Sequence, residues 1–267
     1  MIRRDLSHFL IKNEFVVTKD FDPRWEDLKT AYEVIRVMNS KVLFLENHLL
    51  RFRFSIQQLS ATATPDLQVL TKNIQKLIEI NGVKEGNIKI VALIGKQEVE
   101  FVAFFIPHFY PDKNMYKSGV DLGLLYAERE NPSAKISNQS TRKKADNLIK
   151  STGLFEVLLV NHQNHITEGS RSNVFFIKNQ KLITPPADEV LQGIIRNKVI
   201  EIAIKNGLEM LERFVFPEEI SDFESAFLTG TSLHILPIRS IYLKKFEVQN
   251  PILNILNKLL NTNVISY

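Results

Sequence analysis

The sequence contains no cysteine, and this absence excludes two kinds of site. Without thiols the chain can form no disulfide bond, and it can hold no zinc ion through thiolate ligands. A chain without cysteine also fits a reducing compartment, so we expect the protein in the cytoplasm.

Long apolar runs are also missing, since no stretch reaches the roughly 20 residues needed to cross a bilayer. The segment 1–15 is basic, but its apolar residues are too interrupted for a signal peptide. Charge of one sign is not in large excess, because 34 basic and 30 acidic residues leave a net charge of +4. The short basic cluster at 142–144 has no interleaved aromatic side chains. We therefore expect neither a membrane nor a nucleic-acid partner.

What the sequence does contain is typical of a globular protein, with 44% hydrophobic and 24% charged residues. A chain of 267 residues is long enough for two domains, each with its own core. Strand and helix patterns alternate, which predicts a mixed α/β fold. The loop 107–117, rich in Pro, Asp, Lys and Asn, suggests a smaller domain over 1–113 and a larger one over 114–267.

In the first domain, two predicted hairpins flank two predicted helices. The hairpin strands are 32–37 and 41–45, turning at Asn39-Ser40, and 88–94 and 99–106, turning around Gly95. The helices cover about 47–59 and 65–82, and the second has Thr64 as N-cap, Pro65 in its first turn and Gly82 at its end.

The second domain shows the same alternation. Its predicted strands are 119–126, 155–160, 165–167, 173–178, 181–184 and 225–228. Its predicted helices cover 140–151 and 194 to about 207, and a third begins in the tail at Pro251 with Asn250 as its cap.

Three polar segments of this domain are candidates for function. The segment 167–173 (Thr-Glu-Gly-Ser-Arg-Ser-Asn) lies between two strands and gathers small polar groups around Glu168. The segment 191–196 leads Gly193 into a helix start, where free backbone N–H groups and the helix dipole favour a phosphate. The hydroxyls of segment 229–232 suit an anion or a cap. Each segment alone also fits an ordinary turn or loop–helix junction.

In this order, however, the segments resemble class IV (fold-type IV) aminotransferases that depend on pyridoxal 5′-phosphate (PLP). This family includes branched-chain aminotransferases, D-amino-acid aminotransferases and 4-amino-4-deoxychorismate lyases. The resemblance runs from about residue 30 to residue 242. It is also carried by the motifs at 32–37, 46–51, 116–120, 128–138, 153–156, 184–186 and 227–231, and by Pro237. It implies a small N-terminal α/β domain and a larger C-terminal domain with a barrel-like sheet.

The resemblance also implies PLP as cofactor and assigns roles to individual residues. Lys135, in the context Lys-Ile-Ser-Asn, corresponds to the lysine that forms the Schiff base with PLP. Glu168 corresponds to the carboxylate that pairs with the pyridine nitrogen, and Arg51 to an arginine that contacts the phosphate. The further cofactor-binding positions implied are Ser172, Asn173, Gly193, Ile194, Ile195 and Thr231, and the substrate positions are Tyr32, Thr231 and Ser232.

Departures from the family pattern concern the substrate side. Residues 27–31 (Asp-Leu-Lys-Thr-Ala) replace a Gly-Asp-Gly or Gly-Asp-Ser turn that many relatives carry. Gln139 follows Asn138 where tyrosine or arginine is common, and Lys89 stands where arginine is common. No Arg-x-His pair follows Gly95, unlike in D-amino-acid aminotransferases.

The activity implied is transfer of an amino group between an amino acid and a 2-oxo acid. The expected amino acid is a branched-chain or hydrophobic one. Two alternatives stay open: a PLP lyase of the 4-amino-4-deoxychorismate type, and a PLP-binding homologue with weak or no catalysis. The family also implies a homodimer. No metal ion is expected.

Overall fold

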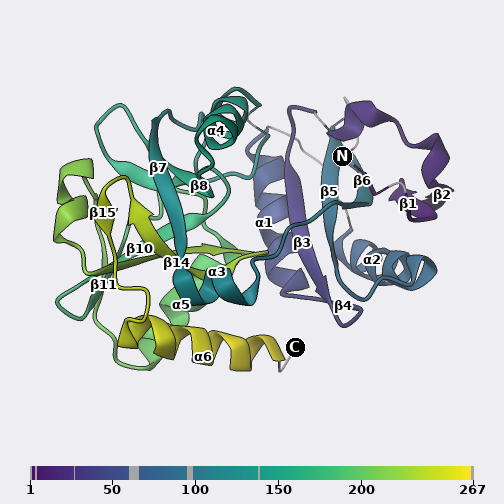
Figure 1. Cartoon of the computed structure of the whole chain (residues 1–267). Helices are drawn as coiled ribbons and strands as arrows, with labels where there is room; N and C mark the ends of the chain where they lie inside the picture. The colour runs from purple at the N-terminus through teal and green to yellow at the C-terminus, as the bar shows by residue number, and fades with distance from the viewer. Residues whose placement is uncertain are drawn as a thin grey trace. The chain divides into compact units, whose positions relative to one another are not determined.

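The computed structural model describes residues 2–3, 5–26, 28–59, 66–94, 99–137 and 139–265. The chain forms two compact units (Figure 1). The first unit comprises Met1–Phe109 together with Ala134–Ser137, and the second comprises Tyr110–Ser133 and Asn138–Ser266. The chain thus returns briefly to the first unit, with Lys135 in the returning segment. No pattern in the sequence indicates this return.

The first unit is built on a six-stranded sheet in the order β2-β1-β6-β5-β3-β4. Its neighbouring strands all run antiparallel. The strands are β1 (His8–Ile11), β2 (Glu14–Val17), β3 (Tyr32–Met38), β4 (Lys41–Val42), β5 (Gly86–Ile94) and β6 (Val99–Ile106). The predicted strands 32–37, 88–94 and 99–106 are confirmed, whereas β1 and β2 were not predicted.

The turn at Asn39-Ser40 is confirmed, because both residues have positive φ (51° and 61°), as a tight hairpin turn requires. The prediction of a strand over 41–45 is wrong beyond Val42. Phe44 takes a left-handed conformation with φ 51°, and helix α1 (Leu45–Gln57) starts directly after it. The turn around Gly95 lies outside the described residues.

One face of this sheet packs against α1 and α2 (Leu67–Asn81), whose apolar stripes form a common core with the sheet. Gly82 ends α2 in a left-handed conformation with φ 60°, as predicted. The predicted cap Thr64 and Pro65 lie outside the described residues. Asp66 caps the helix instead, and its carboxylate accepts from the backbone N–H groups of Gln68 and Val69.

The opposite face packs against the N-terminal segment, which contains two short 3₁₀ helices, η1 (Thr18–Asp20) and η2 (Pro23–Glu26). Aromatic side chains fill this interface. The Phe21 ring lies 4.7 Å from that of Phe104 and 5.3 Å from that of Trp25, both edge-on. The first unit is therefore a sheet buried on both faces.

The second unit contains a nine-stranded sheet in the order β12-β11-β10-β13-β14-β7-β8-β9, with β15 paired to β14. The strands are β7 (Val120–Tyr126), β8 (Glu156–Val160), β9 (Ile166–Gly169), β10 (Asn173–Lys178), β11 (Lys181–Thr184), β12 (Met210–Glu212), β13 (Ser225–Gly230), β14 (His234–Ile241) and β15 (Lys244–Lys245). The six strands predicted here are confirmed, and β12, β14 and β15 were missed.

This sheet must curl strongly, because β9 and β10 lie five strand positions apart in the order of the sheet. Five positions in a flat sheet would separate them by about 24 Å. Only residues 170–172 join the two strands, and so short a link spans at most about 14 Å. The barrel-like sheet implied by the resemblance is thereby confirmed.

The helices of this unit follow the prediction closely, with one exception. The three predicted helices appear as α4 (Gln139–Thr152), α5 (Ile194–Lys205) and α6 (Pro251–Ile265), and η3 (Pro217–Asp222) is an additional 3₁₀ helix. The loop predicted over 107–117 instead contains α3 (Lys113–Ser118), which Asp112 caps by accepting from Met115 N. Among the described residues, no helix is long and apolar enough to cross a membrane.

Candidate active site

In the first unit, a buried ionic cluster links β3 to α1. Strand alternation places Glu33 on the same side as the core residues Ile35 and Val37, so its carboxylate is fully buried. Arg51 donates to both of its oxygens, from Nε at 2.6 Å and from Nη2 at 2.9 Å. His48 Nδ1 lies 2.9 Å from Oε2. His48 and Arg51 reach the same carboxylate because residues three apart share a helix face.

The ionisation states of Glu33 and His48 follow from their burial and from the groups that they contact. Burial alone would raise the pKa of the Glu33 carboxyl, but the Arg51 guanidinium and His48 outweigh this and hold the pKa well below its usual range. Burial lowers the pKa of His48, although Glu33 opposes the shift. The imidazole is therefore neutral at neutral pH, and its Nδ1 carries the proton donated to the Glu33 carboxylate. The cluster fixes the direction of the Arg51 guanidinium.

The backbone of Lys135 is held from both sides. Its N–H donates to Ser55 Oγ at 3.0 Å, and its carbonyl accepts from Tyr32 N at 3.0 Å. Ala31 and Ile136 form an antiparallel bridge next to this contact. The Lys135 amine lies 5.0 Å from the centre of the Tyr32 ring, within the range of a cation–π contact. Three predicted site residues, Tyr32, Arg51 and Lys135, are thus connected through β3, α1 and Ser55.

Lys89 adds a second cation to the same ring. Its amine lies 5.5 Å from the centre of the Tyr32 ring and donates to the carbonyl of Glu26. The Tyr32 ring therefore has two lysine amines near it. An anionic group bound at this ring would meet concentrated positive charge.

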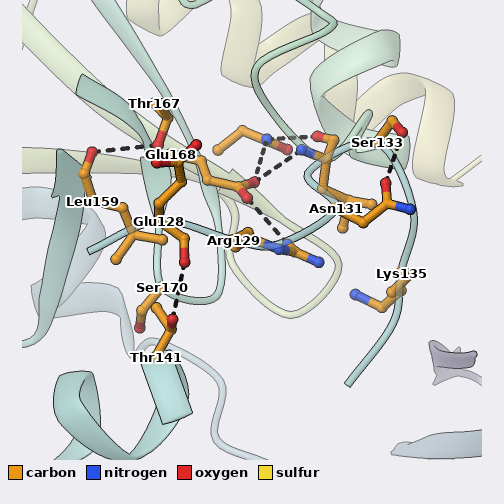
Figure 2. Close-up of polar contacts among 12 residues, drawn as sticks. Glu128, Arg129, Asn131, Ser133, Lys135, Thr141, Leu159, Thr167, Glu168 and Ser170 are labelled. Atoms are coloured by element: carbon orange, nitrogen blue, oxygen red, sulfur yellow. Dashed lines mark hydrogen bonds and ion pairs between the residues drawn. The ribbon is translucent and has the colours of Figure 1, made fainter. Parts of the chain in front are cut away.

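In the second unit, the carboxylate of Glu168 on β9 is buried and accepts hydrogen bonds from three donors (Figure 2). Arg129 Nη1 donates to Oε1 at 3.0 Å. Asn173 Nδ2 at 3.3 Å and Leu191 N at 3.2 Å donate to Oε2. These donors come from three separate segments of the chain, so they fix the carboxylate in one orientation.

The start of α5 packs closely against Asn173. The amide of Asn173 also donates to the Leu191 carbonyl at 2.7 Å. A Cβ atom at Gly193 would overlap Asn173 Oδ1, so only glycine fits at this position. Gly193 is the N-cap of α5, and the helix begins with Ile194 and Ile195. The first turn of a helix presents backbone N–H groups without helical partners, which favours an anion.

The turn after Glu168 is held by a second buried carboxyl group, that of Glu156 on β8. Ser170 Oγ donates to Oε1 at 2.6 Å and Ser172 Oγ to Oε2 at 3.4 Å. Burial raises the pKa of Glu156 although Ser170 and the Val157 N–H oppose the shift. The predicted cofactor residue Ser172 thus contacts Glu156, and its contact with a cofactor stays a prediction.

Thr231 and Ser232 lie in the turn between β13 and β14, and both are partly exposed. Just before them, Thr229 pairs with Asn173 across β13 and β10. Its hydroxyl is buried without a hydrogen-bond partner. Cross-strand partners point to the same side of a sheet, so this hydroxyl lies on the side where Asn173 meets α5.

The sequence assigned no role to several residues of these clusters. Glu33 could have been identified from the sequence, because it occupies one of the alternate strand positions that face the core, and a carboxylate there requires a partner. Arg129, Ser55 and Glu156 could not be identified in this way, because their contacts join segments distant in sequence. Asn138 lies outside the described residues. Among the described residues, no group of three or more His, Cys, Asp or Glu side chains is arranged to hold a metal ion.

Comparisons with known proteins identify the family of the chain. A protein of Rickettsia conorii named "Probable branched-chain-amino-acid aminotransferase" is 28% identical over 231 residues, covering 79% of this chain and 77% of that protein. The D-alanine aminotransferase of Bacillus licheniformis is 26% identical over 228 residues, covering 79% of this chain and 78% of that enzyme.

A solved structure shares the fold. It is a branched-chain amino acid aminotransferase from Thermobaculum terrenum in its PLP form, with a TM-score of 0.84 and 22% identity. The match covers 99% of this chain and 95% of that one. The model of the family "Amino-transferase class IV" matches residues 30–241. That span includes both polar clusters, and the chain belongs to the class IV aminotransferases.

Proposed function

We propose that this chain is a PLP-dependent transaminase that exchanges an amino group between an amino acid and a 2-oxo acid. The observation that supports it most directly is Glu168, whose buried carboxylate is oriented by three donors. Burying a carboxylate is costly unless it has partners, and these partners hold Glu168 in one orientation. Family membership and the PLP form of the Thermobaculum structure support the choice of cofactor.

The chemical groups available fit PLP. The cofactor needs an amine for its aldehyde, a carboxylate for its pyridine nitrogen, and N–H or cationic donors for its phosphate. Lys135, Glu168 and Arg51 are the residues assigned to these roles. The first N–H groups of α5, at Ile194 and Ile195 after the N-cap Gly193, are assigned to the phosphate. Thr231 is assigned to the same phosphate. Asn173 donates to Glu168, and Ser172 contacts Glu156 in the turn that follows Glu168.

When bound, PLP supplies an electron-accepting ring that stabilises the charge developing at the substrate Cα. Glu168 would hold a proton at the pyridine nitrogen, because a fixed carboxylate favours the charged form of its partner. The Lys135 amine, once freed, would take a proton from the substrate Cα as general base and deliver it as general acid to the C4′ carbon of PLP. Tyr32 and Ser232 would line the substrate side.

The proposed donor is a hydrophobic or branched-chain amino acid, as the name of the Rickettsia relative suggests. The D-alanine aminotransferase similarity leaves the handedness of the substrate to experiment. We propose a panel of L- and D-amino acids with 2-oxoglutarate as acceptor, followed by detection of the 2-oxo acid product. A parallel assay for pyruvate release from 4-amino-4-deoxychorismate tests the lyase alternative.

The decisive test of the cofactor assignment uses borohydride reduction of the PLP-loaded protein. We expect the reduced cofactor on the peptide containing Lys135, detected by mass spectrometry, and no labelling in Lys135→Ala. Lys143→Ala, in the exposed face of α4, is the control and should label normally. Labelling of another lysine in the unaltered protein would refute the role of Lys135. Labelling of Lys135 without turnover of any donor would instead favour a homologue with weak or no catalysis.

We further propose that the chain works as a homodimer in the cytoplasm. Both statements rest on the family, together with the absence of cysteine for the compartment. Light scattering after size-exclusion chromatography should give twice the chain mass of 30.8 kDa. A mass equal to one chain would contradict the dimer.

A further inference from the structure

We propose that Ser55 is a positioning residue that sets the direction of the Lys135 side chain. The inference rests on the proposed function, because it assumes that the Lys135 amine reacts with the cofactor. No sequence motif marks Ser55, which is the third residue from the end of α1 and is fully buried.

The Ser55 hydroxyl makes two hydrogen bonds with a defined polarity. Its oxygen accepts from the backbone N–H of Lys135 at 3.0 Å, and its proton goes to the carbonyl of Arg51 at 2.9 Å. A hydroxyl has one proton, so the bond to Arg51 leaves a lone pair directed at Lys135. The hydroxyl is thereby locked in one orientation.

The two sides of Lys135 depend on different elements. Its carbonyl is held by Tyr32 N on β3, and the neighbouring Ser137 N–H donates to the Thr30 carbonyl at 3.0 Å. Its amide is held by Ser55 on α1. Without the Ser55 hydroxyl, the peptide group preceding Lys135 loses this side-chain acceptor, while the strand-like contacts after it persist.

A small rotation at this peptide is amplified along the lysine side chain. The amine lies about 6 Å from Cα, so a rotation of about 10° moves it by about 1 Å, and a displacement of that size can cost about a hundredfold in rate. Arg51 and Ser55 are one turn apart on α1. The same helix therefore positions both the proposed phosphate ligand and the proposed reactive lysine.

The test compares Ser55→Ala with Ser118→Ala in the full-length protein loaded with PLP. Ser118 is the matched control, because its hydroxyl donates to the Asn114 carbonyl four residues earlier, as the Ser55 hydroxyl donates to the Arg51 carbonyl. We expect Ser55→Ala to be labelled at Lys135 by borohydride, with kcat about tenfold lower and KM within about twofold of the unaltered protein. The pH midpoint of the visible absorbance of the bound cofactor should also move, and Ser55→Thr should restore both values.

Several outcomes would overturn the inference. One is that Ser55→Ala matches Ser118→Ala in kcat and in the pH midpoint. Another is that Ser55→Ala lowers only the melting temperature, which would indicate a structural role alone. If Ser55→Ala does not fold, Ser55→Cys provides the same comparison with a side chain of similar size. Failure of the proposed function is seen separately, as absence of Lys135 labelling in the unaltered protein.

Discussion

Replacing Gly193 with alanine would insert a methyl group where Asn173 already lies. The new Cβ would overlap Asn173 Oδ1 and lie 3.3 Å from its Cγ and 3.5 Å from Arg196 Cβ. Asn173 would have to move and give up its hydrogen bonds to Glu168 and to the Leu191 carbonyl. The clash costs about 1–3 kcal/mol and each lost hydrogen bond about 1 kcal/mol.

We therefore expect Gly193→Ala to lower the free energy of unfolding by about 3–5 kcal/mol and the melting temperature by about 6–20 °C. Gly86→Ala is the control, because its Cβ would meet its nearest atom, Val83 Cγ1, at 3.2 Å, and side-chain atoms can adjust to that contact. Differential scanning calorimetry and equilibrium dialysis of PLP would measure stability and cofactor binding. Cofactor affinity should fall with Gly193→Ala and stay unchanged with Gly86→Ala.

A double-mutant cycle tests whether the methyl group acts through Asn173. In an Asn173→Ala background the overlapping oxygen is gone, so adding Gly193→Ala should cost at least about 1 kcal/mol less than it does in the unaltered chain. Equal costs in the two backgrounds would show that the methyl group does not act through Asn173.

Two further predictions concern the buried carboxyl groups. Glu33→Gln should destabilise the chain by about 3–5 kcal/mol at pH 7, because it leaves Arg51 without its carboxylate. The pKa of Glu33 is lowered in the fold, so this difference should be present above about pH 4.3 and shrink as the pH falls, in urea unfolding at several pH values. Burial raises the pKa of Glu156, so its contribution is complete below about pH 4.3 and is lost as the pH rises through the raised value. Glu156→Gln should therefore gain stability relative to the unaltered chain as the pH rises above about 4.3, and a difference that stays constant with pH would contradict this.

Much of the fold could be predicted because its signals are local. Strand β3, the hairpin of β10 and β11, and the end of α2 at Gly82 each follow from a few neighbouring residues. The errors occurred where local signals compete. Lys41 to Leu45 read as a strand because valine and leucine suit one, but the left-handed Phe44 turns the chain into α1.

The candidate site could be predicted only in part. The family motifs assign roles to Lys135, Glu168 and Arg51. Glu33 could also be identified, because it occupies a core-facing position of β3 where a carboxylate requires a partner. The contacts of Ser55 with Lys135 and of Glu156 with Ser170 join residues separated by 80 and 14 positions. Pairings across such separations depend on how strands and helices assemble, which no local pattern encodes.

The return of Ala134–Ser137 to the first unit has a consequence for dividing the protein. A gene cut after Phe109 would place Lys135 on one polypeptide, while Ser55 and Tyr32, which bind its backbone, would be on the other. Neither polypeptide alone would hold the lysine in place. Mixing the two would restore the arrangement only if residues 134–137 paired again beside β3, so recovery of Lys135 labelling in a split protein would report that one strand-like contact.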